Sequence, residues 1–232
     1  MPREPKEDAN MSRGSFLPAV LGLALAGVAC GHPEKQVVDN YFNAVRAKDN
    51  QTLSSFATAR FERPVQSWAI KETLEENTEP MPLVALNEKL KQAEAAQAAN
   101  TKEARTYNLD HFADIDQVRD LRSKGKPVPA KMSGVATKWD EFNQKDRETK
   151  KAVAEAKDAA EKEKRNMALS VGTTEGLEAM QGEVKTKKIA VDVTIEGQSQ
   201  PYVMVLKRYE AKREGGPRVQ SRWIIQSIQP RT

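Results

Sequence analysis

Residues 83–170 form a long, charged stretch in which helix-favouring residues dominate and one short segment interrupts them. In the first half, Leu83, Leu86 and Leu90 recur every three or four residues, which is the period of one helix face. The second half has the same period and then becomes rich in alanine, glutamate and lysine, which favour helix. The interruption at 125–129 contains one glycine and two prolines, and these residues end helices. The sequence therefore predicts two long helices that fold back as an antiparallel hairpin.

The predicted hairpin is not expected to be stable without contacts to other parts of the chain or to a partner. Its heptads are interrupted by polar residues such as Gln97, Asn100 and Lys157, so it is a poor self-contained coiled coil. Aromatic residues make up only 6% of the chain and charged residues 30%, which predicts a modest core. We expect the hairpin to lean on the rest of the chain or on a partner.

Residues 35–82, which precede the hairpin, are predicted to form the N-terminal helical part of a body. Residues 34–47 carry a broad apolar stripe, and a second short helix that begins at Thr52 turns its apolar side chains inward. The apolar residues between Phe61 and Ile70 predict extended or mixed structure that packs on these helices.

Residues 171–232, which follow the hairpin, are predicted to form an antiparallel β meander. From Ile189 to Ile195, apolar and polar residues alternate, as expected for a strand with one buried face. A turn leads to a second strand at 202–209, and a Gly-Gly-Pro turn leads to a third at 219–228. The predicted fold class is therefore α+β.

An uncharged apolar segment, Phe16–Ala29, lies near the start of the chain and is followed by its one cysteine, Cys30. Arg13 precedes it, which is the layout of a secretory signal peptide. The run is shorter than the roughly 20 residues of a spanning helix. We expect Met11 to be the biological start, because residues 1–10 carry more acidic than basic side chains. A cleaved soluble protein and an uncleaved membrane helix are the alternatives.

The four residues Gly27-Val28-Ala29-Cys30 resemble the lipobox of bacterial lipoproteins. The resemblance implies that residues 1–29 are removed and that residues 30–34 form a lipidated tether with acyl chains on Cys30. More than one acyl chain gives durable attachment to a membrane. The implied location is the bacterial cell envelope, and Gly31 after the cysteine implies the outer membrane, facing the periplasm.

The order of the predicted elements, with the run from Val37 to Ala44 followed by Leu53-Ser-Ser-Phe56, resembles small NTF2-like lipoproteins of unknown function. The resemblance covers about 35–70 and 184–229. It implies an NTF2-like cone, in which N-terminal helices lie across the C-terminal sheet, and it makes 83–170 an inserted helical hairpin. The side chains that would line a pocket in such a cone are Tyr41, Phe56, Trp68 and Trp223.

Residues that could catalyse a reaction or hold a metal are scarce. His32 falls in the tether, and His111 lies beside acidic residues in the hairpin, where polar surface is the simpler role. One cysteine and two distant histidines do not make a metal site. Asp192 alternates with valines and is expected to face solvent. We predict no catalytic residue, cofactor or metal.

The charge distribution is uneven, because residues 184–232 contain ten basic and four acidic residues. A basic sheet can favour anionic ligands, although solvated strand faces are the simpler explanation. Nucleic acid is not expected as a partner of an exported protein with no aromatic-basic motif.

These observations together predict a membrane-anchored binding or scaffolding module for another envelope protein. The side chains expected to contact that partner are Leu83, Leu86, Leu90, Trp139 and Phe142. The alternative hypotheses are a small-molecule carrier that uses the cone pocket and, behind it, an enzyme.

Overall fold

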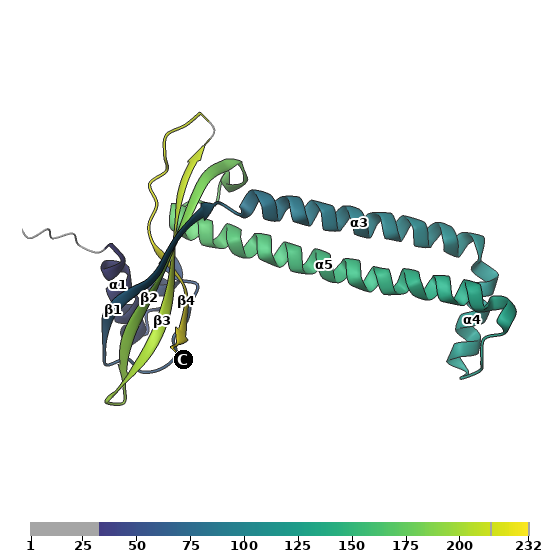
Figure 1. The fold of residues 1–232 in the computed structure, drawn as a ribbon, viewed down its shortest axis with the longest axis horizontal. Helices are drawn as coiled ribbons and strands as arrows, with labels where there is room; N and C mark the ends of the chain where they lie inside the picture. The colour runs from purple at the N-terminus through teal and green to yellow at the C-terminus, as the bar shows by residue number, and fades with distance from the viewer. Residues whose placement is uncertain (1–32, 214, 232) are drawn as a thin grey trace, which may run out of the picture. The chain divides into compact units, whose positions relative to one another are not determined.

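The computed structural model describes residues 33–213 and 215–231, and Figure 1 shows how their helices and strands are arranged. The predicted signal peptide, the Met11 start, Cys30 and His32 lie outside the described residues. Within the described part there are five α-helices, two short 3₁₀-helices and four strands. In chain order these are α1 Pro33–Ala47, α2 Asn50–Phe56, β1 Ser67–Pro80, α3 Leu83–Asp110, α4 Phe112–Ser123, η1 Ala130–Met132, α5 Ser133–Val171, η2 Leu177–Ala179, β2 Met180–Ile195, β3 Gln198–Arg213 and β4 Ile224–Pro230.

The four strands pair as one antiparallel sheet in the order β1-β2-β3-β4. β2 and β3 pair along their whole length, from Met180 opposite Arg213 to Ile195 opposite Gln198. The predicted combination of helices with an antiparallel sheet is confirmed. The strand that was expected to begin near Ile189 is β2, and it begins earlier, at Met180. The first half of β2 contributes to a second buried cluster, described below.

β1 was not expected as a regular strand, and it corrects the description of residues 35–82 as helical. It pairs with β2 over its full length, with two register shifts. Residues 71–80 are all exposed, so they lack the alternation that identifies a strand. Charge pairs hold this edge instead: Lys188 bonds Glu75 at 2.6 Å, and Lys187 lies 3.2 Å from Glu76. Bulges and charges of this kind also discourage pairing with another chain.

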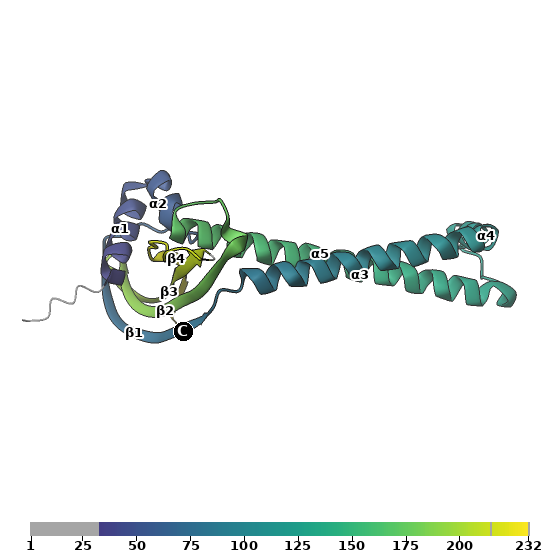
Figure 2. The same ribbon diagram turned by 90° about the horizontal axis from the view of Figure 1, so that it is seen from above.

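The sheet carries buried side chains on both faces. Leu206 pairs with Ile225, and both belong to one buried cluster, whereas the adjacent Ile224 and the nearby Tyr209 belong to another. Since neighbouring strand residues point to opposite faces, the two clusters lie on opposite sides of the sheet. The first lies under α1 and α2, which Figure 2 shows on the inner side of the curved strands β1 and β2.

The second cluster, which we call the hairpin base, joins the sheet to the two long helices. Its buried members come from the start of α3, the end of α5, η2 and the three strands beside them. They are Met81, Leu83, Met167, Val171, Leu177, Met180, Val184, Tyr209, Ala211 and Ile224. Burial of these side chains is the main apolar contact between the long helices and the sheet.

The helices α3 and α5 lie side by side in both views (Figures 1 and 2). The first predicted helix is divided, however, because the backbone leaves helical geometry at His111 before α4 begins. No glycine or proline marks this break, so nothing in the sequence predicts it. α5 ends at Val171 as expected, where Gly172 adopts a left-handed conformation with φ of 79°.

A third, smaller cluster of Val118, Met132 and Ala136 closes the end of the hairpin away from the sheet. We call α4 together with residues 107–111 and 124–142 the distal end. Within residues 33–231, no described helix has both the length and the apolar character that crossing a membrane requires.

Candidate functional site

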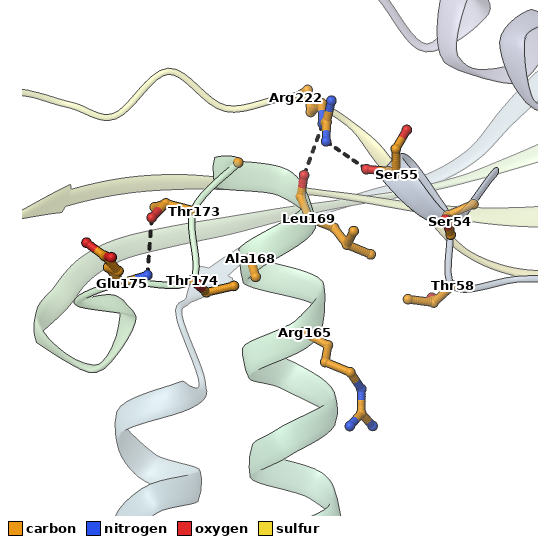
Figure 3. Close-up of a pocket in the computed structure, with 12 residues that line it drawn as sticks. Ser54, Ser55, Thr58, Arg165, Ala168, Leu169, Thr173, Thr174, Glu175 and Arg222 are labelled. Atoms are coloured by element: carbon orange, nitrogen blue, oxygen red, sulfur yellow. Dashed lines mark hydrogen bonds between the residues drawn. The ribbon is translucent and has the colours of Figure 1, made fainter. Parts of the chain in front are cut away.

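A groove of about 760 Å³ opens where three distant segments of the chain meet (Figure 3). One wall is α2 with the residues just after it, another is the end of α5 with the following loop, and Arg222 comes from the segment before β4. The lining residues are Ser54, Ser55, Ala57, Thr58, Arg165, Ala168, Leu169, Gly172, Thr173, Thr174, Glu175 and Arg222.

Arg222 holds the groove together by satisfying the end of α5. The last carbonyl groups of a helix have no partner inside it. Arg222 donates from Nε to the carbonyl of Leu169 at 3.0 Å and from its backbone N–H to the carbonyl of Ser170 at 2.9 Å. Its Nη2 also donates to the carbonyl of Ser55 at 2.7 Å, which ties α2 to α5. A positive group at this helix end is also favoured by the helix dipole.

The hydroxyl groups on the α2 side of the groove use their protons within the protein. Ser54 Oγ donates to the carbonyl of Gln51 at 2.9 Å, and Ser55 Oγ donates to that of Thr52 at 2.8 Å. On the loop side, Thr173 Oγ1 accepts the N–H of Glu175 at 3.1 Å, as the dashed line in Figure 3 marks. The α2 wall therefore offers a ligand mainly acceptors.

Two guanidinium groups and one carboxylate give the groove a net positive charge. The nearest carboxylate to Arg165 is that of Glu161, at 3.9 Å, the outer limit of an ion pair. Among the described residues Arg222 forms no ion pair, because its bonds go to neutral carbonyls. Figure 3 shows Glu175, the one carboxylate, on the other side of the end of α5 from Arg165.

The four predicted pocket residues belong to the first core cluster, and the groove is lined by other side chains. Tyr41, Phe56 and Trp223 are buried, and Trp68 is half-buried with its Nε1 donating to Asp39 at 2.8 Å. Trp68 also stacks on Phe42, with ring centroids 5.3 Å apart. Burial raises the pKa of Tyr41 to about 12, and its hydroxyl donates to the carbonyl of Ala59 at 3.2 Å.

A buried polar network lies beside the hairpin base. Tyr209 donates its phenol proton to Glu163 at 2.6 Å, and Lys207 lies 3.5 Å from the same carboxylate. Burial, then the charge of Glu163, raises the pKa of Tyr209. Ser170 accepts the backbone N–H of Tyr209 at 3.1 Å and donates to the carbonyl of Arg222 at 2.7 Å. These bonds fix the end of α5 against β3 and connect it to the groove.

The structure separates the five predicted partner-contact residues. Leu83 is only 2% exposed and packs in the hairpin base, so it is not available to a partner, which corrects that prediction. Leu86 and Leu90, which both lie on α3, are half-buried. Trp139 and Phe142 are also half-buried, at the distal end, where Arg119 lies 5.0 Å from the Trp139 ring and Lys138 lies 5.4 Å from that of Phe142.

Two apolar side chains that the sequence reasoning missed are far more exposed. Leu109 is 70% exposed and Phe112 is 62% exposed, on either side of the break at His111. We call these two residues the distal apolar pair. The only signal for them in the sequence was two large apolar residues that depart from the helix stripe, next to a histidine.

The remaining candidate side chains from the sequence are His111, between α3 and α4, and Asp192, on β2. No group of three or more potential metal ligands occurs in the part of the chain that is described. His111 packs against Tyr107, with ring centroids 4.4 Å apart. Asp192, which was expected to face solvent, is half-buried and paired with Lys71 at 3.2 Å.

A comparison with known proteins finds no matching family model, no similar curated protein and no similar solved structure.

Proposed function

We propose that this chain is a lipid-anchored protein of the bacterial cell envelope that binds another envelope protein through the distal end of its helical hairpin. The observation that carries the proposal is the exposure of the distal apolar pair. Full burial of a side chain such as Leu or Phe contributes about 1.5–3 kcal/mol, so a partner that covers both residues gains appreciable affinity. The proposed activity is binding without catalysis.

The surroundings of the distal apolar pair indicate what kind of surface would cover it. Asp110, Asp114 and Asp116 are exposed next to the pair, and none of them forms an ion pair with another described residue. A partner surface with an apolar centre and basic side chains around it would complement this arrangement. Trp139 and Phe142 stay in the proposal as half-buried neighbours at the same end.

The anchor in this proposal is Cys30, which comes three residues before α1 begins at Pro33. The apolar segment before it and its lipobox-like residues support export and lipidation. We propose the outer membrane, facing the periplasm, as its location, because Gly31 follows the cysteine.

We further propose that the body is an NTF2-like cone and that the helices between β1 and β2 are an insertion in it. Support comes from α1 and α2, which pack on one face of an antiparallel sheet whose strands β1 and β2 curve around them (Figure 2). The order of the elements, with α3, α4 and α5 between the first two strands, is compatible with an insertion.

Position-specific crosslinking in intact envelopes tests the proposal. A photoreactive amino acid in place of Phe112 should capture a partner, whereas the same probe in place of Leu74, which is 40% exposed on β1, should not. A Leu109→Ser/Phe112→Ser chain should fail to co-purify that partner, and a Leu74→Ser chain should retain it. Equal capture from both positions, or retention by the double variant, would refute the role of the distal end.

The anchor needs a separate measurement. A Cys30→Ser chain should lose incorporation of labelled fatty acid and leave the membrane fraction, since the thioether to lipid cannot form. Continued labelling of this variant would contradict lipidation at Cys30.

A further inference from the structure

We propose that the groove between α2 and the end of α5 binds a small amphiphile with a single carboxylate. Its head group would lie near Arg165 and its apolar body against Ala168 and Leu169. The groove is far along the chain from the distal apolar pair, so this inference goes beyond the proposed function and does not depend on it.

The charge of the groove selects an anion. Arg165 and Arg222 both line it, and the one carboxylate within 4 Å of either is that of Glu161, 3.9 Å from Arg165, among the described residues. Glu175 also lines the groove, but Figure 3 shows it on the other side of the end of α5 from Arg165, so the excess of positive charge at the Arg165 side favours an anion there. The planar guanidinium of Arg165 also matches the two oxygens of a carboxylate.

The hydroxyl groups favour a carboxylate over a phosphate. Phosphate binding needs several donors, yet Ser54 and Ser55 donate their protons to the carbonyls of Gln51 and Thr52. Thr58 likewise donates to the carbonyl of Gln226 at 3.2 Å. These three hydroxyl protons are therefore not available to a phosphate, whereas one carboxylate needs only the donors of a single guanidinium such as that of Arg165.

The rest of the groove suits an apolar body. Ala168 and Leu169 are half-buried on the side of α5 that faces α2, and Ala57 lies opposite them (Figure 3 shows the first two). The volume of about 760 Å³ falls within the range of about 300–1,000 Å³ typical of ligand sites. Apolar walls with a few polar groups at one end are the common form of such sites.

Three amphiphiles with the same tail and different head groups test the inference. The full 232-residue chain, made by cell-free synthesis without membranes so that Cys30 is not acylated, is titrated calorimetrically with decanoate, decanol and decylammonium below their micelle concentrations. We expect decanoate to bind roughly tenfold more tightly than decanol, because it gains a charged hydrogen bond, and decylammonium to bind most weakly. Equal binding of the three, or binding of none, would overturn the inference.

Variants then locate the binding. Arg165→Gln should remove the preference for decanoate, and Ser54→Trp, at an exposed position on the groove wall, should weaken binding of all three amphiphiles. Arg147→Gln is the matched control, because Arg147 lies on the same helix, bonds Gln144 and does not line the groove. Undiminished decanoate preference in Arg165→Gln would show that the amphiphile binds elsewhere, for instance at the apolar segment before Cys30, and would refute the assignment.

Discussion

The two ends of the helical hairpin contrast in how they use their apolar side chains. At the hairpin base, Leu83, Met167 and Tyr209 are at most 2% exposed, and hydrogen bonds to Glu163 and Ser170 complete the contact. At the distal end, only a small cluster is buried, and Leu109 and Phe112 face outward. At the base the apolar side chains are buried and stabilise the fold, whereas at the distal end part of the apolar surface stays exposed. Stability and binding should therefore respond to different substitutions.

The largest effect is expected from Gly182→Ala, close to the base. Gly182 has φ of 146°, and a Cβ there would lie 2.1 Å from the carbonyl oxygen of Glu210 on the neighbouring strand. The Gly182 carbonyl also accepts the N–H of Met81, which leads into α3. We expect a loss of about 4 kcal/mol in the free energy of unfolding, measured by urea denaturation. Gly197→Ala, where φ is also positive but no atom lies within 4 Å, should cost only about 1 kcal/mol.

A pair of methionines compares the two ends directly. Met167 is fully buried in the base, and Met132 is 2% exposed in the small distal cluster. Met167→Ala should cost about 3 kcal/mol, and Met132→Ala about 2 kcal/mol, because the smaller cluster can collapse further around the cavity. Equal costs in denaturation would mean that the distal end is packed as firmly as the base.

Removing one hydroxyl tests the polar part of the base. Tyr209→Phe leaves the buried Glu163 carboxylate without its 2.6 Å donor, although Lys207 remains nearby. We expect a loss of about 2 kcal/mol in the free energy of unfolding. An unchanged value would show that solvent or Lys207 replaces the phenol at no cost.

Alkaline pH should weaken the body through its buried phenols. Burial raises the pKa of Tyr41 to about 12, and the pKa of Tyr209 is also raised, so the unfolded chain gives up these protons at lower pH than the folded protein. The free energy of unfolding should hold below about pH 10 and fall as the pH rises towards 12. Denaturation at stepped pH measures this, and in Tyr41→Phe the fall should be shallower.

The smallest effect on stability should come from the distal apolar pair. Because both residues are mostly exposed, Leu109→Ser and Phe112→Ser should each change the free energy of unfolding by less than about 0.5 kcal/mol. The same substitutions should abolish partner capture if the proposed function is right. Strong destabilisation would instead mean that the pair packs within the hairpin, which would remove the contrast between the two ends.

The elements that could be predicted from the sequence are those with a regular apolar pattern. Ile189, Val191, Val193 and Ile195 recur at every second position and are all buried, and the helix that ends before Gly172 shows a helical period and a clear stop. β1 could not be predicted in full, because residues 71–80 are exposed on both faces and leave no pattern. The break at His111 was invisible for a similar reason, since neither glycine nor proline marks it.

The candidate sites were harder to predict than the fold. The groove joins Ser55, Leu169 and Arg222, which are far apart in sequence and meet only through the packing of α2 on the end of α5. The distal apolar pair was missed because apolar residues in a helix are normally assigned to the core. Leu83 is the opposite error, because it was expected to contact a partner and is instead buried in the hairpin base.

Because α5 is long and uninterrupted, the packing at the hairpin base determines where its distal end lies. With 39 residues and a rise of 1.5 Å per residue, this helix is about 58 Å long, and the packing around Met167 and Tyr209 holds one end of it against the sheet. A tilt of α5 by a few degrees at its sheet end would displace its distal end by several ångströms. The direction of the hairpin is therefore sensitive to small changes in this buried cluster.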